Sequence, residues 1–181
     1  SITHFIPIDP NQFFKQFNKN LSNKTSSTFG SSWKNEFERS EKNHTNYLEN
    51  CQWSDLKAHD LIQKQISNKN LNLQMGNSSS VRYIQLFKTL ESITYNSNRG
   101  VSGIDGSSST AVGAAECTSK PTLLISGDLS FIYDQNSLWN NSLPSNLKII
   151  VINNQGGGIF NIIPGPKTTL FSKKHFETKH D

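Results

Sequence analysis

Cysteine and long apolar stretches are scarce in this chain of 181 residues. Its two cysteines, Cys51 and Cys117, cannot build a disulfide scaffold, and they show no Cys-x-x-Cys spacing. No apolar run approaches the roughly 18 residues that a membrane-spanning helix needs. The first residues, 1–4, provide neither the basic start nor the apolar core of a signal peptide. We therefore expect a cytoplasmic protein without a membrane span.

Clustered positive charge is also missing. The formal net charge of +4 and the isoelectric point near 9.1 could suit a nucleic-acid partner. The lysines, however, are scattered from Lys15 to Lys179, with no cluster beyond the pair Lys173-Lys174. A nucleic-acid-binding face needs clustered basic residues, usually interleaved with aromatic ones. The sequence therefore argues against a nucleic-acid partner.

Asn and Ser are abundant, with 21 and 25 residues, whereas the hydrophobic fraction is a lean 33%. Residues 18–32 contain little that could be buried, which is typical of a linker or a mobile surface loop. The length fits one domain, or one domain with an appended linker, and we place the boundary after residue 32. The chain has no initiator Met, and residues 173–181 end without a closing element. We therefore interpret it as a fragment that is truncated at its C-terminus.

Apolar spacing and capping residues predict several helices. A short amphipathic helix is expected around residues 13–17, where Phe recurs at helical spacing. Residues 33–50 are predicted to form a polar helix, and residues 54–67 a second one with Ser54 as its N-cap. A further helix is expected to carry the apolar residues between positions 81 and 90.

Apolar runs bounded by turn residues predict strands between these helices. The expected strands are residues 1–9, 71–74, 93–95, 122–126 and 147–152. The unbroken apolar run within the last of them suits a strand that is covered on both faces, as in a parallel sheet. The alternation of strands and helices therefore predicts an α/β fold, with a doubly wound, mainly parallel sheet and helices on both faces.

Two polar loops directly follow the last two predicted strands. In an open α/β sheet, ligands bind outside the carboxyl ends of the strands. Asp128 supplies a carboxylate, Asn154 supplies a side-chain carbonyl, and the glycines 156–158 let a backbone carbonyl approach a cation. Such oxygen ligands suit magnesium that holds phosphates. Gly127 has no side chain, so the backbone there can approach an anion. Backbone amides at the start of the next helix could face a diphosphate.

The two loops together are a more specific signal than either loop alone. Taken singly, a Gly-Asp pair after a strand is often a turn with a helix cap, and a glycine run is often a flexible loop. Asp128 and Asn154 are 26 positions apart, which is the spacing of the thiamine-diphosphate motif. Two further segments point to one family among the enzymes that share this motif. They are Ser-Asn-Arg-Gly-Val-Ser-Gly-Ile-Asp-Gly at 97–106 and Gly-Asp-Leu-Ser at 127–130. In detail over residues 73–166, the chain resembles 2-succinyl-5-enolpyruvyl-6-hydroxy-3-cyclohexene-1-carboxylate synthase of menaquinone biosynthesis.

The resemblance implies a thiamine-diphosphate-binding fold with assigned roles. Asp128, Asn154 and the backbone carbonyl of Gly156 would hold magnesium (or manganese) against the diphosphate. Ile104 would be the bulky wedge that forces the two rings of the cofactor into a V, although it could instead anchor its loop to the core. The implied cofactor-binding set is Ser102, Gly103, Ile104, Gly127, Asp128, Leu129, Ser130, Asn154, Gly156 and Ile159.

Arginine is rare, and two of the three Arg residues, Arg82 and Arg99, fall inside the motifs. Arg grips a carboxylate in a bidentate way. Ser78 lies four positions before Arg82, so the two should share a face near the N-terminal end of the predicted helix. Without the resemblance, Arg82 would be interpreted as a surface residue. The resemblance implies two carboxylate substrates, 2-oxoglutarate and isochorismate. The implied substrate-binding set is Ser78, Arg82, Arg99, Ile159, Phe160 and Ile163, with helix packing as the alternative for its apolar members.

The resemblance also implies that catalysis needs parts that this chain lacks. In the superfamily, the Glu that activates the cofactor comes from an N-terminal domain across a subunit interface, so no catalytic residue is assigned here and a homo-oligomer (dimer or tetramer) is expected. Residues 1–32 would be the end of a central domain and its linker. Residues 33–181 would be an incomplete C-terminal domain. We predict that the chain alone is catalytically inert, and carboligation by the purified chain would contradict this.

Three alternatives differ in class. Another thiamine-diphosphate enzyme, of the acetolactate synthase or 2-oxoacid decarboxylase type, would share both loops but not the segment 97–106. A dinucleotide-binding module would need Gly-x-Gly-x-x-Gly at the start of a helix, and the glycines 156–158 lack that spacing. A non-catalytic interaction domain on the same fold would be favoured by loss of Asp128 or Asn154, and both are present.

Overall fold

A computed structural model describes residues 2–21 and 27–180 of the chain. The chain divides into two compact units, Ser1–Glu49 and Asn50–Asp181. The boundary predicted after residue 32 lies inside a helix, and the structure instead divides near residue 50. Of the predicted linker, residues 22–26 lie outside the described part of the chain.

The first unit consists of helix α1 (Pro10–Asn20) and helix α2 (Phe29–Asn50). Asp9 caps α1 by accepting hydrogen bonds from the backbone amides of Asn11 and Gln12 at 2.9 and 3.3 Å. Both helices were expected. The strand predicted for residues 1–9 is wrong, because described residues 2–9 form no strand. This segment contains Pro7, which cannot donate to a sheet ladder.

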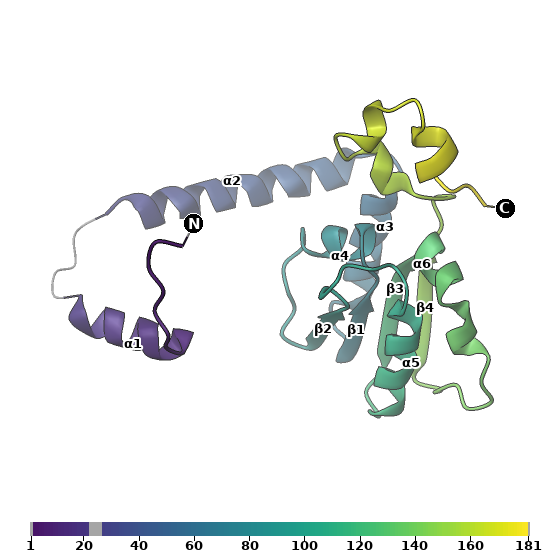
Figure 1. The fold of residues 1–181 in the computed structure, drawn as a ribbon, viewed down its shortest axis with the longest axis horizontal. Coiled ribbons are helices and arrows are strands. Elements are labelled where there is room, and N and C mark those ends of the chain that lie inside the picture. The colour runs from purple at the N-terminus through teal and green to yellow at the C-terminus, as the bar shows by residue number, and fades with distance from the viewer. Residues whose placement is uncertain (1, 22–26, 181) are drawn as a thin grey trace. The chain divides into compact units, whose positions relative to one another are not determined.

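The second unit alternates helices and strands along the chain (Figure 1). Its helices are α3 (Asp55–Ile66), α4 (Ser79–Ile84), α5 (Ser107–Glu116) and α6 (Asp128–Tyr133). Its strands are β1 (Leu71–Met75), β2 (Ile93–Ser97), β3 (Thr122–Gly127) and β4 (Leu147–Ile152). Short helical turns follow at Gln135–Leu138, Gly158–Asn161, Pro166–Thr168 and Ser172–Phe176. Helix α4 is shorter than expected, since it ends at Ile84 rather than near position 90.

The four strands form one parallel sheet in the order β2-β1-β3-β4. The crossovers between them contain helices, as parallel connections require. This confirms the predicted α/β fold with a parallel sheet. Because all four strands point the same way, the loops that follow β1, β3 and β4 converge at one edge.

Both faces of the sheet are covered by helices. On one face, Leu73 and Ile125 from the two central strands are fully buried in a cluster with Ile66 of α3 and Val81 of α4. Leu124 points to the other face, because side chains alternate along a strand. There the buried alanines of α5 allow that helix to approach β3 closely.

We expected residues 147–152 to form a strand covered on both faces, but β4 is less buried than that. Its residues are half-buried or exposed, and Val151 is 36% exposed. The reason is that β4 pairs only with β3 and lies at the edge of the described sheet. No helix in the described part of the chain is long and apolar enough to cross a membrane.

Candidate functional site

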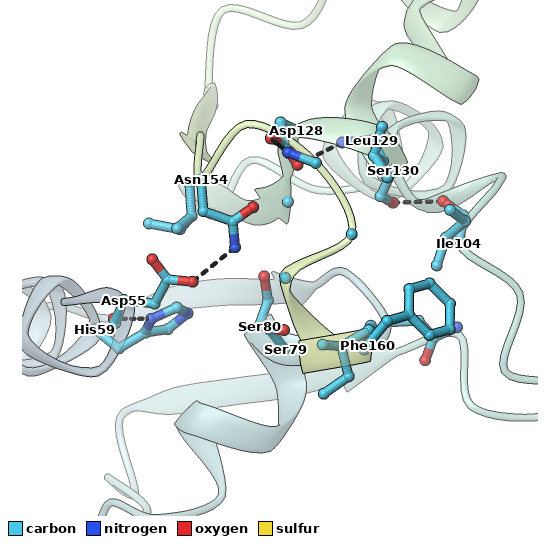
Figure 2. Close-up of a pocket in the computed structure, with 18 residues that line it drawn as sticks. Asp55, His59, Ser79, Ser80, Ile104, Asp128, Leu129, Ser130, Asn154 and Phe160 are labelled. Atoms are coloured by element: carbon cyan, nitrogen blue, oxygen red, sulfur yellow. Dashed lines mark hydrogen bonds between the residues drawn. The ribbon is translucent and has the colours of Figure 1, made fainter. Parts of the chain in front are cut away.

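A cavity of about 130 Å³ lies where the loops after β1, β3 and β4 meet the N-terminal turn of α3. Figure 2 shows side chains from these separate segments turned toward a common space. Ten of the residues predicted for the site line this cavity. They are Ser78, Ile104, Gly127, Asp128, Leu129, Ser130, Asn154, Gly156, Ile159 and Phe160. The two loops that carried the prediction therefore meet in space.

Asp128 is the buried acid of the cavity, only 5% exposed. It is the first residue of α6, directly after β3. Its Oδ1 accepts a hydrogen bond from the amide of Leu129 at 2.8 Å. Its Oδ2 accepts one from the amide of Gly156 at 2.9 Å and lies 2.9 Å from Nε2 of His180. The carboxylate thus ties β3 to the loop after β4.

Replacing His180 by alanine is expected to strengthen magnesium binding at Asp128. A cation approaching Oδ2 has to displace the His180 ring, and hydrogen bonds to charged groups contribute about 1.5–3 kcal/mol. Since the His180 side chain is 20% exposed, we expect a gain of only about three- to tenfold in affinity. Magnesium titration by calorimetry, with thiamine diphosphate present, measures it. His175→Ala, in the same segment but away from Asp128, is the matched control. Weaker magnesium binding by His180→Ala would contradict this interpretation.

The loop after β4, residues 153–158, is called the glycine loop here. Asn154 lies near its start, and its Nδ2 donates to Oδ2 of Asp55 at 2.9 Å. The carbonyl of Gly156 accepts from the amide of Gly158 at 2.9 Å, which makes the turn tight. Gly156 has a φ of +136°, a conformation that side chains disfavour. A glycine is therefore required where this loop passes the buried acid.

The loop between β2 and α5 supplies the apolar part of the cavity. Ile104 is half-buried, and its carbonyl accepts a hydrogen bond from the hydroxyl of Ser130. Gly103 does not line the cavity, but its carbonyl accepts from Nδ2 of Asn77 at 2.5 Å. Ser102 lies outside the cavity, is exposed and has a positive φ of 58°. Hydrogen bonds therefore tie this loop to the residues that follow β1 and β3.

The predicted substrate residues are only partly brought together. Ser78 lines the cavity as the N-cap of α4, whereas Arg82 lies in the last turn of that six-residue helix and is exposed. Arg82 lies four positions after the N-cap Ser78, as expected, but it is exposed and does not line the cavity. Arg99 is exposed outside the cavity, and its Nη1 donates to Oδ1 of Asn77 at 3.3 Å. Ile163 also lies outside the cavity.

Sequence analysis missed several residues of the cavity. They are Asp55, His59, Asn77, Ser79, Ser80, Ile152, Gly157 and Gly158. The glycines could have been included, because they continue the glycine loop, and Asn77 directly precedes the predicted Ser78. Asp55 and His59 carry no comparable signal, since they are polar residues of an amphipathic helix about 100 positions before the glycine loop. Their role in the cavity follows from packing alone.

His59 is fully buried in the wall of the cavity. Its Nδ1 lies 2.6 Å from the backbone carbonyl of Asp55, and its ring packs 5.1 Å from that of Tyr83. Burial lowers the pKa of His59 below its ordinary value of 6.5, against smaller opposing effects of the Asp55 carbonyl and charge. A neutral ring that donates from Nδ1 leaves Nε2 as a bare acceptor, and Nε2 has no partner among the described residues.

The lowered pKa of His59 predicts acid sensitivity of the fold. Below pH 6.5, His59 binds a proton in the unfolded chain, whereas in the folded chain it does so only at lower pH. The free energy of unfolding therefore falls as the pH decreases through that interval. His59→Phe removes this proton and should flatten the dependence. Urea unfolding over a pH series measures the slope for both proteins. For the wild type, equal slopes of the free energy of unfolding against pH above and below pH 6.5 would contradict the prediction.

The charge around the cavity is unusual for an anion site. Its lining includes two carboxylates, Asp55 and Asp128, but no Lys or Arg among the described residues. An anionic diphosphate would be repelled by such a wall unless a divalent cation neutralised it. Magnesium commonly binds through one or two carboxylates together with phosphate oxygens. No group of three His, Cys, Asp or Glu side chains able to hold a metal occurs in described residues 2–21 and 27–180. Magnesium held partly by a phosphate ligand therefore fits this set of oxygen ligands better than a metal held by protein alone.

Three curated proteins that are similar to this chain share one name. No protein-family model matches the chain. Curated proteins of *Flavobacterium psychrophilum* and *Christiangramia forsetii* are 45% and 52% identical to it over 180 and 138 residues, which are 99% and 76% of this chain. A protein of Porphyromonas gingivalis is 38% identical in an alignment of 186 positions, gaps included, that covers 98% of the chain. All three are named 2-succinyl-5-enolpyruvyl-6-hydroxy-3-cyclohexene-1-carboxylate synthase. The chain belongs to this synthase family.

Membership of the synthase family agrees with the resemblance inferred from residues 97–106 and from the two loops. It favours this family over the acetolactate synthase and 2-oxoacid decarboxylase alternatives. Nearly the whole chain matches these relatives, but it spans only about a third of their length. It covers 32% of the Flavobacterium psychrophilum protein and 31% of the Flavobacterium johnsoniae protein. The activity of the whole synthase is therefore not assigned to these 181 residues by similarity alone.

Proposed function

We propose that this chain is the part of a menaquinone-biosynthesis synthase that binds magnesium and thiamine diphosphate. The whole protein would decarboxylate 2-oxoglutarate and add the remaining four-carbon unit to isochorismate. It would do so in the cytoplasm as a homo-oligomer, dimer or tetramer. The observation that carries the proposal is the meeting of Asp128 and Asn154, from loops 26 positions apart, in one cavity beside the glycine loop.

The cavity offers the ligands that such a magnesium ion needs. Asp128 and the carbonyls of Asn154 and Gly156 would hold the cation, and the cation would hold the diphosphate. Gly157 and Gly158 support this arrangement, because a β-carbon at Gly157 would lie 2.6 Å from the carbonyl oxygen of Phe176 and one at Gly158 would lie 2.9 Å from Nδ2 of Asn154, so side chains there would displace the loop or the amide. When bound, thiamine diphosphate supplies a nucleophilic carbon and accepts the electron pair released by decarboxylation. The two carboxylates of the wall make magnesium necessary for binding rather than merely helpful.

The other residues of the cavity would position and shelter the reactants. Ile104, tied through its carbonyl to Ser130, would support the rings of the cofactor. Ile159 and Phe160 would exclude water from the reacting carbon, and Phe160 is itself fixed against Phe176, with ring centroids 5.3 Å apart. Exclusion of water prevents unwanted protonation of a reactive carbanion.

The two arginines would bind the substrate carboxylates. Arg99 donates to Asn77, which lines the cavity and whose amide also donates to the carbonyl of Gly103. Arg82 is exposed and free to turn toward a substrate that enters from solvent. Planar, bidentate pairing with a carboxylate is what the guanidinium group favours. Ser78 lines the cavity before the same helix and could donate a further hydrogen bond.

A chimera tests the proposed activity. The matched region of the *Flavobacterium psychrophilum* synthase, 45% identical over 180 residues, is replaced by this chain, and consumption of 2-oxoglutarate is measured with isochorismate present. We expect turnover that requires both magnesium and thiamine diphosphate. The same chimera with Asp128→Ala is the control and should be inactive. A folded chimera that binds the cofactor but consumes neither substrate would contradict the proposed activity.

A further inference from the structure

Asn154 is tied to the first turn of α3 by a single hydrogen bond. Its Nδ2 donates to Oδ2 of Asp55 at 2.9 Å, across 99 positions of sequence. An ionised carboxylate only accepts hydrogen bonds, so it selects the NH₂ edge of the amide. Figure 2 shows the nitrogen of Asn154 turned to Asp55 and the oxygen turned to the side where Asp128 lies. We propose that Asp55 is a positioning residue that keeps Oδ1 of Asn154 facing the metal. This inference rests on the function proposed above.

Asp55 is itself held firmly, which a positioning residue requires. It is the first residue of α3, and the hydroxyl of Ser54 caps this helix by accepting from the amide of Lys57 at 3.3 Å. The backbone carbonyl of Asp55 lies 2.6 Å from Nδ1 of His59, whose ring is fully buried. The buried ring thus anchors the turn from which the Asp55 carboxylate reaches the glycine loop.

Gly158 lies beside the nitrogen end of the Asn154 amide. A β-carbon at Gly158 would lie 2.9 Å from Nδ2 and 3.4 Å from Cγ of Asn154. The first of these distances is shorter than van der Waals contact, so only glycine leaves the amide in its present place. Gly158 therefore leaves room for the amide nitrogen that donates to Asp55.

The importance of the Asp55 bond lies in orientation rather than in stability. Asn154 is exposed and Asp55 is half-buried, and a hydrogen bond in such a place adds only about 0.5–1.5 kcal/mol. An amide that is free to flip, however, presents N–H groups to the cation in place of its oxygen. Residues that orient metal ligands in this way contribute about 10- to 100-fold to metal affinity.

Manganese titration of the chain in the presence of thiamine diphosphate tests the inference, with free manganese followed by electron paramagnetic resonance. We expect Asp55→Ala to bind manganese about 10- to 100-fold more weakly than the wild type. Asp55→Asn can donate as well as accept, so it no longer selects the NH₂ edge of the Asn154 amide and should also lose affinity. If Asp55→Asn keeps the wild-type affinity, an acceptor-only partner is not needed to orient the amide, and the inference is overturned.

Two further variants separate orientation from general damage. Gly158→Ala displaces the amide without touching Asp55 and should also weaken manganese binding. In an Asn154→Ala background, Asp55→Ala should have no additional effect on manganese affinity, since there is no amide left to orient. An equal loss in both backgrounds would overturn the inference.

The side-chain amide resonances of Asn154 provide a direct readout of the bond. They should move in Asp55→Ala without any metal present. If they move while manganese affinity is unchanged, the bond is only structural and the positioning role is wrong, although the proposed function stands. If the wild-type chain binds no manganese with thiamine diphosphate, the proposed function fails and the inference fails with it.

Discussion

Asp128→Ala is expected to abolish magnesium-dependent binding of thiamine diphosphate. Asp128 is the buried carboxylate of the cavity, and the other carboxylate there, Asp55, is engaged by Asn154. Residues that only orient metal ligands contribute about 10- to 100-fold to affinity, so loss of a direct ligand should cost more than about 100-fold. Calorimetric titration of thiamine diphosphate at fixed magnesium measures the loss.

The controls for Asp128→Ala address charge and folding. Glu116→Ala removes the same charge from the exposed end of α5 and should leave binding unchanged. Circular dichroism has to show that Asp128→Ala remains folded, because its carboxylate also accepts the amides of Leu129 and Gly156. A folded Asp128→Ala chain with wild-type affinity would remove Asp128 from the metal site.

Leu73→Ala is expected to produce the largest loss of stability in the second unit. Leu73 is 0% exposed in the central strand β1 and packs in the cluster between the sheet and helices α3 and α4. Truncating a buried Leu to Ala costs about 2–5 kcal/mol, through lost burial and the cavity left behind. In a chain of this size, each kcal/mol lowers the melting temperature by roughly 2–4 °C.

The control for Leu73 is Leu86→Ala, since Leu86 is 50% exposed. This substitution should change the free energy of unfolding by less than about 0.5 kcal/mol. Urea unfolding followed by circular dichroism compares the two variants with the wild type. Equal effects of Leu73→Ala and Leu86→Ala would show that the sheet core is not where the structure places it.

The sheet was predictable because its signals are local. β3 and β4 contain short apolar runs, β1 alternates apolar and polar residues, and helices lie between successive strands along the chain. The two loops after β3 and β4 were then expected to meet, because parallel strands end at the same edge. The same reasoning failed for residues 1–9, whose apolar residues predicted a strand although described residues 2–9 form none.

The part of the site that depends on packing was not predictable. Asp55 and His59 reach the cavity because α3 covers one face of the sheet and its N-terminal turns lie beside the loops after β3 and β4. No spacing rule relates Asp55 to Asn154 at a separation of 99 positions. His180 meets Asp128 only because the segment before it turns back over the glycine loop, where the carbonyl of Glu177 accepts from the amide of Gly157 at 2.5 Å. Such contacts depend on the fold as a whole.

Binding of a diphosphate in this cavity should require a divalent cation. Calorimetric titration of thiamine diphosphate into the wild-type chain, first with magnesium and then with a chelator, is the decisive measurement. Because the cavity wall carries carboxylates and no Lys or Arg among the described residues, we predict binding with magnesium and none with the chelator. Equal binding in both conditions, or no binding to the folded chain with magnesium, would contradict the account.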